Sequence, residues 1–347
     1  MKSTDVAIIG AGPIGIELAV RLKREGIDYT HFEAKQIGAT MQWWPQGTRW
    51  FSSNDRIAIA GVPLITPSQE KATREQYLAY LRQIVTQFDL DVRTYEPVTD
   101  IDRETVHGGG FVITTEPAGG TTQTFAKKIV LATGGTDRPR KLDIPGADLP
   151  HVLHYYDDPH TFFRRKVLVI GGKNSAVETA LRCHHVGAKV SLAHRHDALS
   201  ESSIKYWLMP EMKGLLKRNT IEGYFNAEPV RITPTHVTLK RTVAGTEETF
   251  DVEADFVLAM IGYEQDNRLF RLAGLELTGD DQQPTFDEQT MRTNVPGIYV
   301  AGTAMGGTQQ KYRVFLENCH VHVDKIVADL QGETSDAAYE PTEIPES

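Results

Sequence analysis

The chain has very little cysteine: Cys183 and Cys319 are the only two in 347 residues. Two cysteines are too few for the disulfide framework of a small secreted domain or for a cysteine-based zinc site. The histidines do not replace them, because neighbours such as His184 and His185, or His320 and His322, point in different directions on a helix. We therefore expect neither a disulfide scaffold nor a bound metal.

Long apolar runs and excess positive charge are also missing. No run approaches the roughly 18–20 apolar residues that span a bilayer, and the start, Met1–Asp5, lacks the form of a signal peptide. The formal net charge is −9, which argues against nucleic acid or an anionic membrane as the partner. These absences predict a soluble cytoplasmic protein that binds neither nucleic acid nor membrane.

The feature that is present is a repeated strand–turn–helix pattern. The first copy has a strand over 6–9, a glycine-rich turn over 10–15 and a following strand that ends at Glu33. Adding 161 to these positions takes Gly10 to Gly171 and Glu33 to His194, where the second copy ends its following strand. Such a pattern is typical of dinucleotide binding, so the chain is predicted to hold two dinucleotides.

The first copy has the residues that a pyrophosphate requires. Gly10 permits the tight turn, Gly12 lets the phosphate approach the backbone, and Gly15 allows close packing of helix and strand. The N–H groups at the start of the helix point at the phosphate. Glu33 can accept hydrogen bonds from the ribose hydroxyls of an adenosine.

The second copy replaces the acid by His194-Arg195. A carboxylate there would repel a 2′-phosphate, whereas these two residues would attract it. NADPH is therefore predicted in preference to NADH. Lys173 stands at the middle glycine of this turn; either its side chain points away from the phosphate or its ammonium takes part in binding.

The order of elements predicts an α/β fold with two nested, Rossmann-like three-layer dinucleotide-binding domains. The discontinuous first domain is expected at 1–150 and 257–330, with the second at 151–256 and a linker near 140–165. Helices are expected over 13–25, 72–88 and about 311–330. The last 17 residues, 331–347, contain five acids and two prolines but no Lys or Arg, and are predicted to be a disordered acidic tail.

Several strings resemble one family of flavoproteins. They are Phe51-Ser52-Ser53, the turn 170–176, Ser203-Ile204-Lys205, the segment 259–263 and Phe315-Leu316-Glu317-Asn318. Together they are similar to the bacillithiol-disulfide reductase family within the thioredoxin-reductase-like group of two-dinucleotide-domain FAD/NAD(P) proteins. The resemblance implies FAD on the first copy, NADPH on the second, reduction of a low-molecular-weight disulfide, and a homodimer or larger assembly.

The turns and the resemblance together give a set of candidate binding residues. For FAD they are Gly10, Gly12, Pro13, Gly15, Glu33, Ala34, Lys35, Val98, Ala132, Thr133, Gly134, Gly302 and Thr303. For NADPH they are Gly171, Gly172, Lys173, Asn174, Ser175, His194, Arg195, Ile261 and Gly262.

The chain departs from its resemblance in the thiol chemistry. Members of the family commonly carry a cysteine where this chain has Ile14, and the Cys-x-x-Cys of thioredoxin reductases is missing. The wider group usually ends its last strand with Gly-Asp, where this chain has Gly302-Thr303, so a hydroxyl or the backbone would make that contact. Cys319 is expected inside the last helix, as a buried apolar residue rather than a thiolate. The catalytic residue stays unknown, with Cys319 as the only candidate.

Four functions remain open. The leading hypothesis is an FAD-dependent oxidoreductase that passes hydride from NADPH to FAD and on to a small-molecule disulfide or a small redox protein. A ferredoxin/flavodoxin–NADP reductase needs no cysteine and fits the same residues. An FAD/NADPH monooxygenase and a non-catalytic FAD/NADPH-binding redox sensor are the other two alternatives.

Overall fold

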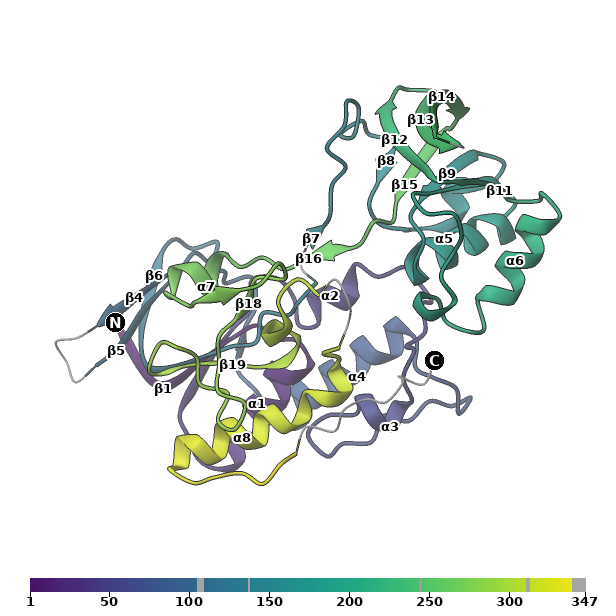
Figure 1. Ribbon diagram of the computed structural model, residues 1–347. Coiled ribbons are helices and arrows are strands. Elements are labelled where there is room, and N and C mark those ends of the chain that lie inside the picture. Colours follow the sequence, from purple (N-terminus) through teal and green to yellow (C-terminus); the bar gives the residue numbers. More distant parts are fainter. Residues whose placement is uncertain (105–108, 137, 244, 310–312, 339–347) are drawn as a thin grey trace. The chain divides into compact units, whose positions relative to one another are not determined.

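The computed structural model describes residues 1–104, 109–136, 138–243, 245–309 and 313–338 (Figure 1). Two compact units form. Unit 1 contains Met1–Trp43, Gly47–Arg138 and the described chain from Glu264 onward, and unit 2 contains Trp44–Gln46 and Pro139–Tyr263. The second unit therefore begins earlier and ends later than the 151–256 expected from sequence. Much of the expected linker belongs to unit 2, because β8 (Val152–Leu153) pairs with the sheet strand β15 (Phe256–Ala259).

Unit 1 is built on a seven-stranded sheet. Its order is β3-β2-β1-β6-β5-β4, and β19 also pairs with β6. The long strand β6 pairs parallel with β1 along one edge, and along its other edge its first half pairs antiparallel with β5 and its second half pairs parallel with β19. The strands are β1 (Lys2–Ile9), β2 (Tyr29–Phe32), β3 (Val92–Arg93), β4 (Val98–Glu104), β5 (Gly110–Thr115), β6 (Thr122–Leu131) and β19 (Ile298–Val300).

Three longer helices accompany this sheet. They are α1 (Pro13–Arg24), α4 (Arg74–Gln87) and α8 (His320–Gln331). A capping box between Thr73 and Gln76 starts α4, and α1 and α8 pack side by side (Figure 1). Shorter elements complete the unit: α2 (Ala39–Gln42), α3 (Asn54–Ile57), α7 (Arg268–Leu272), β17 (Leu277–Thr278), β18 (Gln283–Pro284) and the 3-10 turns η3 (Gly302–Gly306) and η4 (Leu316–Asn318).

Unit 2 has a five-stranded parallel sheet between helices and a second sheet. The parallel order is β11-β10-β9-β15-β8, and β12-β13-β14 form a separate antiparallel sheet. Alternation along β9 separates two cores: Val167 and Val169 pack with the helices, whereas Leu168 and Ile170 pack with the antiparallel sheet. The remaining elements are η1 (Pro159–Phe162), β9 (Lys166–Ile170), α5 (Asn174–His185), β10 (Lys189–His194), η2 (Glu201–Ser203), α6 (Met209–Lys217), β11 (Glu222–Phe225), β12 (Ala227–Ile232), β13 (His236–Val243) and β14 (Thr246–Glu253).

Apart from the short segment Trp44–Gln46, the chain passes between the units at β7 (Arg138–Pro139) and at β16 (Tyr263–Glu264), and these two short strands pair. Within the described residues, no helix has both the length and the apolar character that a membrane span requires. The α/β class and the two Rossmann-like units predicted from sequence are confirmed.

The last helix corrects a prediction. It was expected over about 311–330, but α8 begins at His320 and ends at Gln331. Phe315 interrupts a helix here, because its backbone is extended (φ −124°, ψ 168°) and its N–H group donates to Asn318 Oδ1. Cys319 is consequently the N-cap of α8 rather than a residue within it. Of the expected tail, Gln331 belongs to α8, and residues 339–347 lie outside the described chain.

Candidate dinucleotide sites

The first glycine turn depends on two close backbone approaches. Gly10 has φ +107°, and a Cβ at this position would lie 2.4 Å from the carbonyl oxygen of Ala132. A Cβ on Gly15 would lie 2.0 Å from the carbonyl oxygen of Gly10. Only glycine fits at either position, so β1, the turn and α1 are pressed together as the sequence predicted.

Gly12 differs from Gly10 and Gly15 because a Cβ there would meet nothing within 4 Å. Gly12 is the N-cap of α1, with extended backbone, and Pro13 is the first helical residue. Without a capping side chain, the first N–H groups of α1 are available to an anion. Glycine at position 12 therefore leaves space open beside the N-terminus of α1, and the backbone conformation of the turn does not require it.

Glu33 is already oriented by the backbone. Its carboxylate accepts a hydrogen bond from Ala11 N–H at 2.7 Å through Oε2 and from Lys35 N–H at 2.8 Å through Oε1. Ala34 and Lys35 are exposed on the bend after β2. Each carboxylate oxygen has further acceptor capacity, so the group is held beside the turn and can still accept a ribose hydroxyl.

His31 is a residue that sequence reasoning missed. It is fully buried on β2, and its Nε2 donates to the carbonyl oxygen of Gly10 at 2.9 Å. Burial lowers the pKa of His31 to about 4, against the raising effect of the Gly10 hydrogen bond. The imidazole is thus neutral near pH 7, and its hydrogen bond to Gly10 stabilises the turn. A histidine within an apolar strand, two residues before Glu33, was the available signal.

Two loops of unit 1 meet beside this turn. Thr133 Oγ1 is buried and makes no hydrogen bond with any described residue. Thr303 Oγ1 accepts from Gly135 N–H at 3.1 Å, and Gly302 N–H donates to His322 Nδ1 at 3.1 Å. The backbone N–H of Gly302 is therefore engaged inside the protein. The Thr303 hydroxyl keeps a proton that it can still donate.

Gln265 joins the same two loops and was also missed. Its Nε2 donates to the carbonyl oxygens of Gly134 and Ala304, at 2.8 and 2.9 Å. Two carbonyl acceptors fix the orientation of the amide, and Oε1 is left buried without a partner among the described residues. No local sequence pattern announces such a bridge.

These features fit a bound flavin dinucleotide. The space over Gly12, the unpartnered hydroxyl of Thr133 and the oriented Glu33 carboxylate supply room, a donor and an acceptor. Val98, the remaining predicted FAD residue, is the first residue of β4 and is buried. Val98 as an FAD-binding residue stays a prediction from sequence.

The second turn repeats the backbone of the first. Gly171 has φ +146°, and a Cβ there would lie 2.4 Å from the Met260 carbonyl oxygen. A Cβ on Gly172 would lie 2.1 Å from the imidazole Cε1 of His194. Lys173 is the exposed N-cap of α5 with extended backbone, and Ser175 is exposed in the first turn of the helix. The repeat predicted from the 161-residue spacing is present in the fold.

His194 and Arg195 have different environments, although the sequence analysis predicted the same role for both. Burial, together with the charges of His196 and Arg195, lowers the pKa of His194, and its ring packs over Gly172. Arg195 is exposed and lines a hollow of about 270 Å³ with Asn226, Glu228, Lys240, Arg241 and Thr242. Of these two residues, Arg195 therefore carries the positive charge at neutral pH, whereas His194 packs over the turn.

Three more predicted residues of the second site have structural partners. Asn174 Oδ1 accepts from Lys205 N–H at 2.7 Å, which fixes the segment after η2 beside α5. Ile261 and Gly262 follow β15, and Gly262 has φ +99° with its carbonyl accepting from Arg140 N–H at 3.0 Å. Asn174 thus positions a neighbouring segment, and any contact with the nucleotide would use its remaining Nδ2 donors.

Neither cysteine has the character of a reactive thiolate. Cys183 and Cys319 are free and fully buried. Burial raises the pKa of Cys183 to about 12, although Arg182 opposes this. Burial and the charges of Glu317 and Glu17 raise the pKa of Cys319 well above its ordinary value, and its thiol donates to the Phe315 carbonyl at 2.9 Å. A search of the described residues for three clustered metal-binding side chains finds none.

The comparisons with known proteins agree with this geometry. The profile of the pyridine nucleotide-disulphide oxidoreductase family matches residues 7–302. Bacilliredoxin reductase Bdr of Bacillus subtilis is 35% identical over 93% of this chain and 96% of its own. The structure of bacillithiol disulfide reductase Bdr from Bacillus cereus is 34% identical, with a TM-score of 0.88 over 95% of this chain and 99% of its own. A ferredoxin–NADP reductase of Ignicoccus hospitalis is 28% identical over 86% of this chain and 89% of its own.

The chain belongs to the pyridine nucleotide-disulphide oxidoreductase family. It is an oxidoreductase with FAD and a reduced pyridine nucleotide as its cofactors. The resemblance drawn from the two turns and the family strings is confirmed.

Proposed function

We propose that this enzyme uses NADPH to reduce the disulfide of a low-molecular-weight thiol such as bacillithiol. The observation that carries the proposal is the 35% identity, over 93% of the chain, to a bacilliredoxin reductase. The balanced reaction consumes one NADPH, one proton and one disulfide, and yields NADP⁺ and two thiols. Reaction in the cytoplasm and assembly as a homo-oligomer remain predictions from sequence.

Unit 1 would hold the flavin and unit 2 the nucleotide. The α1 N-terminus, Glu33 and the hydroxyls of Thr133 and Thr303 would bind the FAD phosphates and sugar. Arg195 would bind the 2′-phosphate of NADPH at the end of β10. When bound, FAD supplies hydride acceptance from the nicotinamide and transfer of electrons to the acceptor.

The acceptor would be reduced without a protein dithiol. The chain contains only Cys183 and Cys319, both are fully buried, and burial disfavours the thiolate that disulfide exchange requires. Ile14 stands where relatives commonly carry a cysteine, and it is buried. Electrons would consequently leave the cofactor for the disulfide directly.

An anaerobic titration tests this function. The holoenzyme is reduced with NADPH while the flavin absorbance is followed, and is then mixed separately with bacillithiol disulfide, oxidised bacilliredoxin, ferredoxin or oxygen. The proposal expects fast reduction by NADPH and fastest reoxidation by bacillithiol disulfide. Preferential reoxidation by any other acceptor overturns the substrate, and nucleotide binding without flavin reduction favours the sensor alternative.

Ferredoxin–NADP reductase activity is the second candidate. The buried cysteines favour it, because one-electron transfer to an iron–sulfur protein needs no thiol. It predicts preferential reoxidation in the ferredoxin arm of the same experiment. The oxygen arm, run with and without an added organic substrate, tests the monooxygenase alternative.

A further inference from the structure

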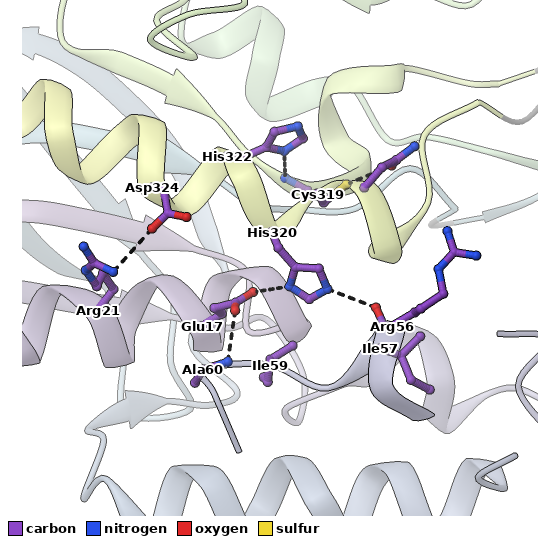
Figure 2. A network of polar contacts seen from close by, with 12 residues as sticks. Glu17, Arg21, Arg56, Ile57, Ile59, Ala60, Cys319, His320, His322 and Asp324 are labelled. Atoms are coloured by element: carbon purple, nitrogen blue, oxygen red, sulfur yellow. Dashed lines mark hydrogen bonds and ion pairs between the residues drawn. The ribbon is translucent and has the colours of Figure 1, made fainter. Parts of the chain in front are cut away.

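A histidine at the start of α8 lies between two acceptors from different parts of unit 1 (Figure 2). His320 Nδ1 is 2.7 Å from Glu17 Oε2 on α1, and His320 Nε2 is 3.1 Å from the carbonyl oxygen of Arg56. The second oxygen of Glu17 accepts from Ala60 N–H at 2.9 Å. A neutral imidazole donates from one nitrogen only. Both bonds of His320 therefore form together only when the ring is an imidazolium.

The surrounding charges favour this protonated state. Burial alone would lower the pKa of His320, but the hydrogen bond and charge of Glu17, the Arg56 carbonyl and the charge of Glu317 raise it above 6.5. Tyr77 and Tyr80 of α4 are uncharged near neutral pH, because burial raises the pKa of each. On α8 itself, burial lowers the pKa of His322 to about 3, so that ring is neutral.

The pair connects segments that carry the candidate FAD residues. Glu17 lies one turn into α1, which begins at Pro13 directly after the first glycine turn. His322 lies two residues after His320 on α8 and accepts from the N–H of Gly302. The contacts to Arg56 and Ala60 add the segment around α3. Movement of the first turn of α8 would therefore reach both the phosphate turn and Gly302-Thr303.

We propose that Glu17 and His320 are positioning residues for the flavin: the protonated pair clamps α1, α8 and the 56–60 segment together and so maintains FAD affinity. The inference rests on FAD binding in unit 1, as proposed above. Loss of the ring proton breaks one of the two bonds of His320 and loosens the first turn of α8.

The pH window follows from the raised folded-state pKa of His320. A raised pKa contributes stability that is fully present below the unfolded value of 6.5 and is lost as pH rises through the folded value. The clamp requires that FAD binds best while His320 is protonated, so FAD affinity is expected to fall as the pH rises from 6.5 through the raised folded-state pKa of His320.

The test measures the FAD dissociation constant of the full chain from pH 6 to 9, with released-flavin fluorescence as the readout. The natural chain is expected to bind FAD about tenfold more weakly at pH 9 than at pH 6, the scale of one lost hydrogen bond to a charged group. His320→Gln should bind FAD weakly with no such slope, because its amide does not titrate. Glu17→Gln should shift the slope to lower pH, because the carboxylate no longer stabilises the imidazolium.

A second ion pair between the same helices provides the matched control. Arg21 and Asp324 lie 3.3 Å apart with about half of each side chain exposed, so Asp324→Asn should leave both affinity and slope unchanged. A flat profile in the natural chain contradicts the proposal even if the variants do not fold. An unchanged slope in His320→Gln, or complete absence of FAD from unit 1, also contradicts it; only the latter also removes the proposed function.

Discussion

The two glycine turns share a backbone but differ in how the end of the following strand is used. In unit 1, His31 and Glu33 both hydrogen-bond to the turn itself, at Gly10 O and Ala11 N. In unit 2, His194 packs over Gly172, and Arg195 lies exposed at a polar hollow. The two turns thus share the backbone that would bind a phosphate, and we propose that the side chains at the strand end select the nucleotide.

The different strand ends also predict how long each nucleotide stays bound. A carboxylate already fixed by two N–H groups loses little freedom when a ribose binds, which favours tight retention. Arg195, by contrast, is exposed beside a surface hollow, and its Nε bonds only to the neighbouring His196 ring among the described side chains. We therefore expect slow FAD release from unit 1 and fast NADPH exchange in unit 2.

The largest predicted effect comes from placing a Cβ at the first glycine of each turn. Gly10→Ala and Gly171→Ala would each meet a backbone oxygen at 2.4 Å in a positive-φ conformation. Each should weaken binding of its own nucleotide by about 5- to 150-fold, equivalent to the roughly 1–3 kcal/mol typical of backbone strain. FAD retention and NADPH affinity are measured for both variants. Equal loss of both nucleotides in either variant would remove the division of ligands between the units.

Gly12→Ala is the matched control for that experiment. Its Cβ meets nothing within 4 Å, so the unfolding temperature of the FAD-free protein should not change. FAD affinity should still fall, because the methyl group enters the space over the α1 N-terminus. A lower unfolding temperature without FAD would show that Gly12 has a folding role instead.

The next largest effect concerns the cation at the end of β10. Arg195→Ala removes a charge-assisted bond to the 2′-phosphate, and KM for NADPH should rise about tenfold or more, since such bonds contribute about 1.5–3 kcal/mol. KM for NADH, which lacks that phosphate, should stay constant. His194→Ala should affect both nucleotides equally, because His194 shapes the turn. A natural chain that prefers NADH would refute the assignment of Arg195.

The smallest predicted effect is at the bridge between the two flavin-side loops. Gln265→Met removes two hydrogen bonds to Gly134 and Ala304 but also the buried, unpartnered oxygen. The free energy of unfolding without FAD should therefore fall by only about 1 kcal/mol. Denaturant melts measure it with and without FAD. A stability loss that grows when FAD is bound would indicate that Oε1 accepts a bond from the cofactor.

The sequence predicted those parts of the fold that a local residue pattern determines. The strand, glycine turn and helix of both copies are present where the repeat predicted them, and α1 was expected to end within one residue of its observed end at Arg24. Prediction from sequence failed where contacts between residues far apart in the chain determine the structure. The extended backbone of Phe315, whose N–H group donates to Asn318 Oδ1, prevents α8 from starting earlier. The bonds from His31 to Gly10 and from His320 to Glu17 join residues 21 and 303 positions apart. No periodicity marks such contacts.

The central claim is that two dinucleotides carry the electrons and no protein thiol relays them. Its most direct test is the double variant Cys183→Ala, Cys319→Ala, loaded with FAD, reduced anaerobically with NADPH and mixed with bacillithiol disulfide. We predict that flavin reduction and disulfide-dependent reoxidation both proceed at the rates of the natural chain. Normal flavin reduction followed by loss of the disulfide step would contradict the claim and return Cys319 or Cys183 to the mechanism.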